Sequence, residues 1–139
     1  MQTKALLGIT ATRALQEKLA QRFSSLGMET SVVCEMNVMK TKEIAILKRQ
    51  LKHLSDYSWI GFTSQNGVKI FFETYEEFLK ENSGKKNSLE DIKFAAIGSG
   101  TAKKLETYGY RADFVPDSYT VAAFAAGLCG IVSKEERIL

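Results

Sequence analysis

Residues 57–79 decide the fold, and they read YSWIGFTSQNGVKIFFETYEEFL. The first part, Tyr57–Thr63, is a short apolar run typical of a buried strand. The later part, Asn66–Leu79, places apolar residues at helical spacing and predicts an amphipathic helix. Between the two lie small polar residues. A strand that passes into a helix in this way is the repeating unit of α/β proteins.

Strand-like and helix-like segments alternate along the rest of the chain. The other predicted strands are Lys4–Thr10, Thr30–Cys34, Lys93–Ile97, Ala112–Val115 and Arg137–Leu139. The other predicted helices are Arg13–Leu26, Thr41–Leu54, Thr101–Tyr108 and Thr120–Val132. Because the connections are short, we expect a parallel sheet with right-handed crossovers and helices on both faces. The fold class is α/β, flavodoxin-like rather than a barrel, since 139 residues are too few for eight strand–helix units.

The predicted helices have a recognisable apolar stripe and recognisable end residues. The helix over Arg13–Leu26 carries an apolar stripe that we expect to face a core, made of Leu15, Leu19, Phe23 and Leu26. Gly27 and Gly109 follow predicted helices at positions where glycine commonly ends a helix. Thr41 is the predicted N-cap of its helix.

Composition excludes several classes of protein. One proline and ten glycines rule out collagen-like and low-complexity chains. The net charge of +3 is spread along the sequence, and its densest cluster, Lys85-Lys86, lies in a polar loop over Asn82–Ser88. This indicates a solvated surface rather than a nucleic-acid patch. The apolar run Ala5–Ile9 is too short for a signal core or a membrane span, so we expect a cytoplasmic protein with no membrane partner.

Cysteine and histidine usage gives no metal site. Cys34 and Cys129 lie in apolar segments, and we expect two buried free thiols. The single histidine, His53, lies in a lysine-rich helical stretch and is expected at the surface. With one histidine and no Cys-x-x-Cys pair, metal binding is not expected.

Three junctions between a strand and the following helix are rich in glycine and small polar residues. In open parallel sheets, ligands bind beyond the carboxyl ends of the strands, where helices begin. Free backbone N–H groups and the helix dipole favour anions there. The candidate binding residues at these junctions are Ser64, Gln65, Asn66, Gly67, Gly98, Ser99, Thr101, Tyr119 and Thr120. Ordinary N-caps and tight turns would use the same residue types, so both interpretations stay open.

The end of the first strand adds Thr10 and Arg13 as candidates. Arg13 either pairs with a carboxylate through two hydrogen bonds or points into solvent. A dinucleotide fingerprint is weak here, because Lys103 stands where the motif of Gly98 and Gly100 needs a third small residue. The candidates are mostly uncharged donors rather than paired carboxylates, a Ser-His-Asp set or metal ligands. They predict a site that holds anionic groups without hydrolysing them.

Two stretches of the sequence carry the motifs of a known family. Residues 56–72, DYSWIGFTSQNGVKIFF, are similar to the Phe-Thr-Ser-x-Asn-Gly-Val motif, followed by an aromatic pair, of the uroporphyrinogen-III synthase family. Residues 94–102 (FAAIGSGTA), residues 108–116 (YGYRADFVP) and then Tyr119-Thr120 resemble its later motifs in order and spacing. The family's Thr-Arg pair after the first strand falls either on Thr10-Ala11, with the arginine lost, or on Thr12-Arg13.

The resemblance implies a bilobal synthase, with two α/β lobes and the substrate in the cleft between them. It assigns residues 1–34 to lobe one, residues 35–136 to lobe two and residues 137–139 to a strand that returns to lobe one. It covers about the first half of a typical member. We therefore expect a truncated chain that is inactive alone and self-associates through its orphaned strand edge.

The implied activity is that of a hydro-lyase in tetrapyrrole (haem) biosynthesis. Hydroxymethylbilane is cyclised to uroporphyrinogen III, with inversion of ring D and loss of water, and neither a cofactor nor a metal is implied. The candidate residues above would bind this polycarboxylate. No catalytic residue is assigned, because the family's tyrosine that helps the hydroxyl leave falls in the half beyond residue 139.

Two other hypotheses remain. One is a non-catalytic α/β module that binds a small anion or a nucleotide. The other is a receiver-like signalling domain, which needs an acidic cluster after the first strand, where Thr10-Ala11-Thr12 supplies none.

Overall fold

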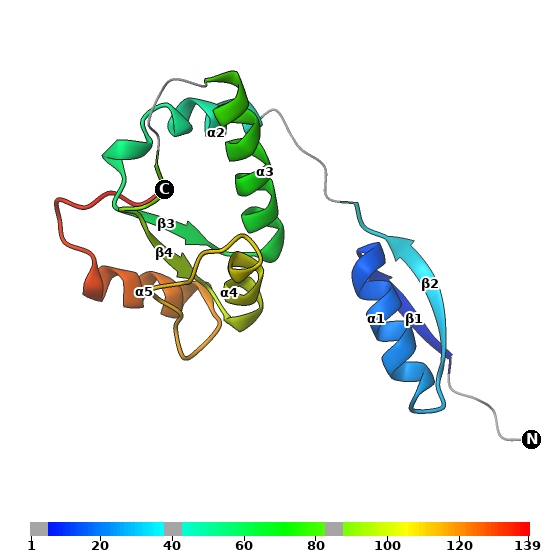
Figure 1. Cartoon of the computed structure of the whole chain (residues 1–139). Coiled ribbons are helices and arrows are strands. Elements are labelled where there is room, and N and C mark those ends of the chain that lie inside the picture. The colour runs from blue at the N-terminus through cyan, green and yellow to red at the C-terminus, as the bar shows by residue number, and fades with distance from the viewer. Residues whose placement is uncertain (1–5, 38–42, 83–87) are drawn as a thin grey trace, which may run out of the picture. The chain divides into compact units, whose positions relative to one another are not determined.

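A computed structural model of the chain describes residues 6–37, 43–82 and 88–139. The chain divides into two compact units, residues 1–39 and residues 40–139 (Figure 1). The assignment of segments to lobes, with boundaries after residues 34 and 136, stays a prediction. Thr41 and Lys85-Lys86 lie outside the described residues.

The first unit is a βαβ motif. It consists of β1 (Leu6–Ala11), α1 (Arg13–Ser24) and β2 (Glu29–Glu35), with β1 and β2 parallel. Burial alternates along β1, because Ile9 and Ala11 are buried whereas Leu6, Gly8 and Thr10 are exposed. This period of two is that of a strand with one covered face. Gly27 ends the helical segment with a positive φ of 75°, as the sequence predicted.

The predicted apolar stripe of α1 is wrong in part. Leu15 and Leu26 are 47% and 66% exposed, and the buried residue of the helix is Gln16. The Gln16 Nε2 group donates to the Ala11 carbonyl oxygen at 2.8 Å and to the Cys34 carbonyl oxygen at 3.0 Å. These bonds satisfy two carbonyl groups near the ends of both strands, so a polar side chain is stable in this position. A two-stranded sheet is also too narrow to cover the whole stripe.

The second unit is built around a parallel strand pair. It contains α2 (Ile44–Leu51), the 3₁₀ turn η1 (Leu54–Asp56), β3 (Trp59–Phe62), α3 (Gln65–Glu81), β4 (Lys93–Ala96), α4 (Ser99–Glu106) and α5 (Val121–Ile131). The register of β3 on β4 runs from Trp59 opposite Lys93 to Phe62 opposite Ala96. The α/β class with parallel strands is therefore confirmed.

Isolated bridges extend the pair on both sides. Ile138 pairs in parallel with Trp59, and Phe114 pairs in parallel with Ala95. The predicted strand Ala112–Val115 is thus reduced to a single bridge. The Asp113 carboxylate accepts a hydrogen bond from the N–H of Phe94 at 2.8 Å. In a longer strand pair, a backbone carbonyl of the neighbouring strand would accept this hydrogen bond.

Helices cover both faces of β3 and β4, as predicted (Figure 1). On one face Ile60, Phe62 and Phe94 join the main core with apolar side chains of α2, α3 and α4. On the other face Trp59 and Ala95 pack with apolar side chains of α5. Successive strand residues therefore serve opposite cores, as the pleat of a strand requires.

The cysteines do not follow expectation. Cys34 and Cys129 are free but exposed, so the predicted burial of both thiols is wrong. Cys34 lies in β2, where residues 31–35 are all exposed. Cys129 lies on the part of α5 turned away from the buried Phe124 and Leu128. His53 is exposed, as expected.

Candidate functional site

The three predicted junctions of the second unit lie at the carboxyl ends of β3 and β4 and at the start of α5. The Ile97 N–H donates to the Phe62 carbonyl oxygen at 2.9 Å and holds the ends of the two strands together. The helix α3 begins at Gln65, and α4 begins at Ser99. The N-termini of both helices therefore open at the same edge of the strand pair.

The start of α3 is a well-formed N-cap. Ser64 is extended, and its Oγ accepts the N–H of Gly67 at 3.0 Å. A Cβ on Gly67 would lie 3.3 Å from that Oγ, so a larger residue would crowd the cap. Asn66 is exposed in the first turn. The capping interpretation is thus confirmed for Ser64, while the Asn66 amide is accessible to a ligand.

The start of α4 has no side-chain cap. Gly98 occupies the N-cap position in an extended conformation, and the first turn of α4 contains no acidic residue. Ser99 and Gly100 are exposed, whereas the side chain of Thr101 is largely buried. The first backbone N–H groups of α4 therefore carry a partial positive charge. The N-cap residue has no side chain that could accept hydrogen bonds from them.

Two side chains flank this uncapped end. A Cβ on Gly100 would lie 2.9 Å from Gln65 Nε2, so the Gln65 amide rests beside the backbone of α4. A Cβ on Gly98 would lie 2.9 Å from Tyr119 Cγ and 3.2 Å from both ring Cδ atoms. The Tyr119 ring therefore covers Gly98. A side chain at position 98 would displace the Tyr119 ring, whereas the flexible end of Gln65 could move away from a side chain at position 100.

Tyr119 is brought there by the start of α5. The neighbouring Thr120 is the N-cap of this helix, and its Oγ1 accepts the N–H of Ala123 at 3.1 Å. The structure thus brings together residues from all three junctions, and contacts around the head of α4 connect them.

Thr10 and Arg13 belong to the first unit. Thr10 is exposed and lies opposite Cys34 in the β1–β2 register. Arg13 opens α1, and its guanidinium lies 3.5 Å from the exposed carboxylate of Glu17. Arg13 is 79% exposed at its side chain, so this ion pair is a weak surface interaction.

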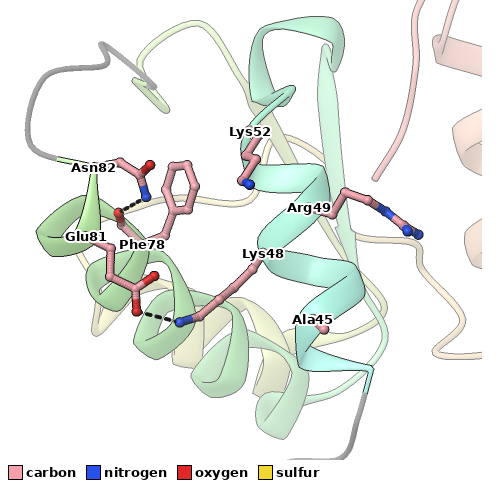
Figure 2. Close-up of a pocket in the computed structure, with 7 residues that line it drawn as sticks. All are labelled: Ala45, Lys48, Arg49, Lys52, Phe78, Glu81 and Asn82. Carbon is pink, nitrogen blue, oxygen red and sulfur yellow. Dashed lines mark hydrogen bonds and ion pairs between the residues drawn. The ribbon is translucent and has the colours of Figure 1, made fainter.

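A separate cavity of about 510 Å³ lies between α2 and the end of α3 (Figure 2). It is lined by Ala45, Lys48, Arg49, Lys52, Phe78, Glu81 and Asn82. Lys48 Nζ is already bound to Glu81 at 2.8 Å and lies 3.7 Å from Glu77, and the hydrogen bond to Glu81 raises the pKa of Lys48. In Figure 2 the Arg49 side chain points away from this pair. The cations do not converge, so this cavity is a poorer anion site than the head of α4.

The chemistry available at the three junctions is hydrogen bonding to anions. Asn66, Gln65 and Ser99 are neutral donors around uncapped backbone amides. Among the described residues, no group of three or more His, Cys, Asp or Glu side chains is placed to hold a metal ion. Within the same residues, no helix has both the length and the apolar character needed to cross a membrane. The sequence predicts these junction residues, but it does not predict the contacts of Gln65 and Tyr119 with glycines, because no local pattern encodes them.

Comparison with known proteins identifies the family of the chain. The family model of uroporphyrinogen-III synthase HemD matches residues 17–139. A porphyrin biosynthesis protein HemD of Ruminiclostridium josui is 27% identical over 131 residues, which are 94% of this chain and 25% of that protein. A putative uroporphyrinogen-III synthase of Methanocaldococcus jannaschii is 26% identical over 132 residues, which are 94% of this chain and 50% of that protein.

The chain thus spans half or less of the length of these relatives. The family match covers all three junctions and most of the first unit. With its α/β architecture, its parallel strands and this match, the chain belongs to the uroporphyrinogen-III synthase HemD family.

Proposed function

We propose that this chain provides the substrate-binding junctions of a uroporphyrinogen-III synthase, whose substrate is hydroxymethylbilane. One observation carries the proposal: the uncapped N-terminus of α4 lies between the Gln65 amide and the Tyr119 ring. Such an end favours carboxylates, which are the charged groups of this substrate. Membership of the HemD family supports hydroxymethylbilane as the proposed ligand.

The proposed role of the site is to fold a flexible chain of pyrroles. Ring closure needs the two ends of a linear molecule to meet, and fixing its carboxylates at several points removes much of the entropy cost of that meeting. Backbone N–H groups that are already in position would also stabilise negative charge that develops on the substrate in the transition state. No side chain in the junctions is assigned as an acid or a base.

Individual residues are given different tasks. The exposed Asn66 and Ser99 side chains would donate directly to ligand carboxylates. Ser64 and Thr120 would hold the α3 and α5 ends in shape as caps, and Thr101 would contribute its backbone N–H. Thr10 and Arg13 remain proposed contacts of the first unit.

We expect binding but not turnover from residues 1–139 alone. The matched region is 25% of one relative and 50% of the other, so these proteins are about four and two times as long as the region that matches. The proposed cleft needs a second lobe. The cytoplasmic location and the self-association expected from the sequence stay predictions.

Calorimetric titration with uroporphyrin III tests the binding. The variants Asn66→Ala and Ser99→Ala should each weaken binding about 3- to 10-fold, which corresponds to the net contribution of about 0.5–1.5 kcal/mol that a typical hydrogen bond makes. Ser55→Ala, an exposed serine that precedes β3, is the matched control and should change nothing. Preferential binding of ATP over uroporphyrin III would instead favour the non-catalytic nucleotide module.

A further inference from the structure

The starting point is the exposure of one aromatic side chain. The chain has eight Phe, five Tyr and one Trp, and all of them lie within the described residues. Thirteen of these are buried or half-buried, whereas Tyr119 is 61% exposed. Burial of an aromatic ring gives a large favourable free energy, which a ring in water does not obtain. An exposed ring in a candidate site is therefore typical of a surface that binds a ligand.

The ring is held in place although it is exposed. Its Cγ and both Cδ atoms are the nearest atoms to a Cβ placed on Gly98, so Gly98 lies under one ring face near Cγ. The backbone next to Tyr119 is fixed as well, because Thr120 caps α5 through Ala123. A ring supported on one side and open to solvent elsewhere is preorganised to stack.

The groups around the ring specify a ligand with two parts. Uncapped amides of α4 begin directly beside Gly98, and the neighbouring Ser99 is exposed. These donors suit carboxylates, whereas the ring suits a flat, electron-rich heterocycle. A pyrrole that carries carboxylate arms meets both requirements at once, and an aliphatic polycarboxylate meets only the first.

We infer that Tyr119 is a specificity-determining residue, whose ring stacks on a pyrrole ring of the ligand while the head of α4 holds that ring's carboxylates. This inference rests on the proposed function, since it assigns a pyrrolic polycarboxylate to the same site. It adds the reason why the site would prefer that ligand over other polyanions. The Tyr119 hydroxyl takes no part.

The experiment compares two polyanions on the full chain. Uroporphyrin III supplies flat pyrrolic rings, and a glutamate peptide with the same number of side-chain carboxylates supplies charge without rings. Wild type, Tyr119→Ala, Tyr119→Phe and the control Val121→Ala are titrated with each. Val121 is also exposed and is the first residue of α5, two positions after Tyr119. Circular dichroism and thermal midpoints establish that each variant is folded.

We expect wild type to prefer uroporphyrin III. Tyr119→Ala should weaken uroporphyrin III binding about 5- to 10-fold, the range expected for one stacked aromatic pair. It should leave binding of the glutamate peptide unchanged. Tyr119→Phe and Val121→Ala should bind uroporphyrin III as wild type does. Rescue by phenylalanine would assign the effect to the ring.

Two results would overturn the inference in distinguishable ways. If wild type binds uroporphyrin III and Tyr119→Ala binds it equally well, with the preference over the peptide intact, the stacking role is wrong while the proposed function stands. If wild type binds neither compound, the proposed function fails and the inference fails with it.

Discussion

Phe114 packs its ring directly against the backbone of Gly127, and no side chain fits between them. Phe114 lies at the bridge to β4, and Gly127 lies in the middle of α5. The missing Cβ therefore lets α5 approach the strand pair and completes the smaller core with Trp59. This contact sets how closely α5 packs against the strand pair.

Gly127→Ala should destabilise the second unit. The added methyl group overlaps the Phe114 ring, and overpacking of this kind lowers the free energy of unfolding by about 1–3 kcal/mol. Gly130→Ala in the same helix is the matched control, because a Cβ there meets nothing within 4 Å. It should raise stability by about 0.5–1 kcal/mol through helix propensity. Urea unfolding followed by circular dichroism measures both; equal effects would contradict the packing account.

Gly98 and Tyr119 should be energetically coupled. Gly98 is extended, with φ −169°, so alanine there causes no backbone strain and its cost is the clash with the ring alone. We expect Gly98→Ala to cost about 1 kcal/mol or more in wild type and close to nothing in Tyr119→Ala. A double-mutant cycle from urea unfolding gives the coupling energy. Strictly additive effects would mean that the ring does not rest on Gly98.

The two hydroxyl caps should contribute to stability. Ser64→Ala and Thr120→Ala each remove an acceptor for a first-turn N–H, and we expect a loss of about 1 kcal/mol for each. Ser99→Ala is the control, since the α4 end has no side-chain cap, and it should stay within about 0.5 kcal/mol of wild type. Thermal or urea unfolding distinguishes them. A loss of stability in Ser99→Ala as large as in Ser64→Ala would show that α4 is capped after all.

Glu136 should stabilise the fold in a pH-dependent way. Its Oε2 accepts the N–H of Ser133 at 2.8 Å and its Oε1 lies 3.9 Å from Lys93 Nζ, and the bond from Ser133 is the main cause that lowers the pKa of Glu136. Because the pKa of Glu136 is lower in the folded than in the unfolded state, its carboxylate stabilises the fold at any pH above the unfolded-state pKa. This stabilisation is lost as the pH falls through the folded-state pKa. The stability difference between wild type and Glu136→Gln should therefore be full at pH 7 and shrink below the ordinary glutamate pKa of about 4.3. Unfolding curves at several pH values, with the exposed Glu135→Gln as control, measure it; a difference independent of pH would contradict the assignment.

Much of the second unit could be predicted from sequence because its signals are local. The run Trp59–Phe62, the polar turn at Ser64 and the stripe that begins at Val68 each specify an element and its start. The polar composition of the junctions also indicated which edge holds the candidate site. The N-caps at Ser64 and Thr120 follow from the side-chain preferences of helix ends.

What sequence reasoning missed depends on contacts distant in the chain. Gln16 is buried because two carbonyl groups, at Ala11 and Cys34, meet it in space. The strand expected over Ala112–Val115 shrinks because the Asp113 side chain takes the N–H of Phe94. The approach of the Tyr119 ring to Gly98 likewise joins residues that precede two different helices, α5 and α4. Periodicity in one segment carries no information on such pairs.

The most direct measurement of the central claim is a map of backbone amide shifts on ¹⁵N-labelled chain titrated with uroporphyrin III. Our account predicts saturable shifts that are largest for the amides of Ser99, Gly100 and Thr101, with smaller ones at Asn66 and Gly67. Shifts confined to the cavity beside Lys48 and Lys52, or no saturable shift in the second unit, would contradict it.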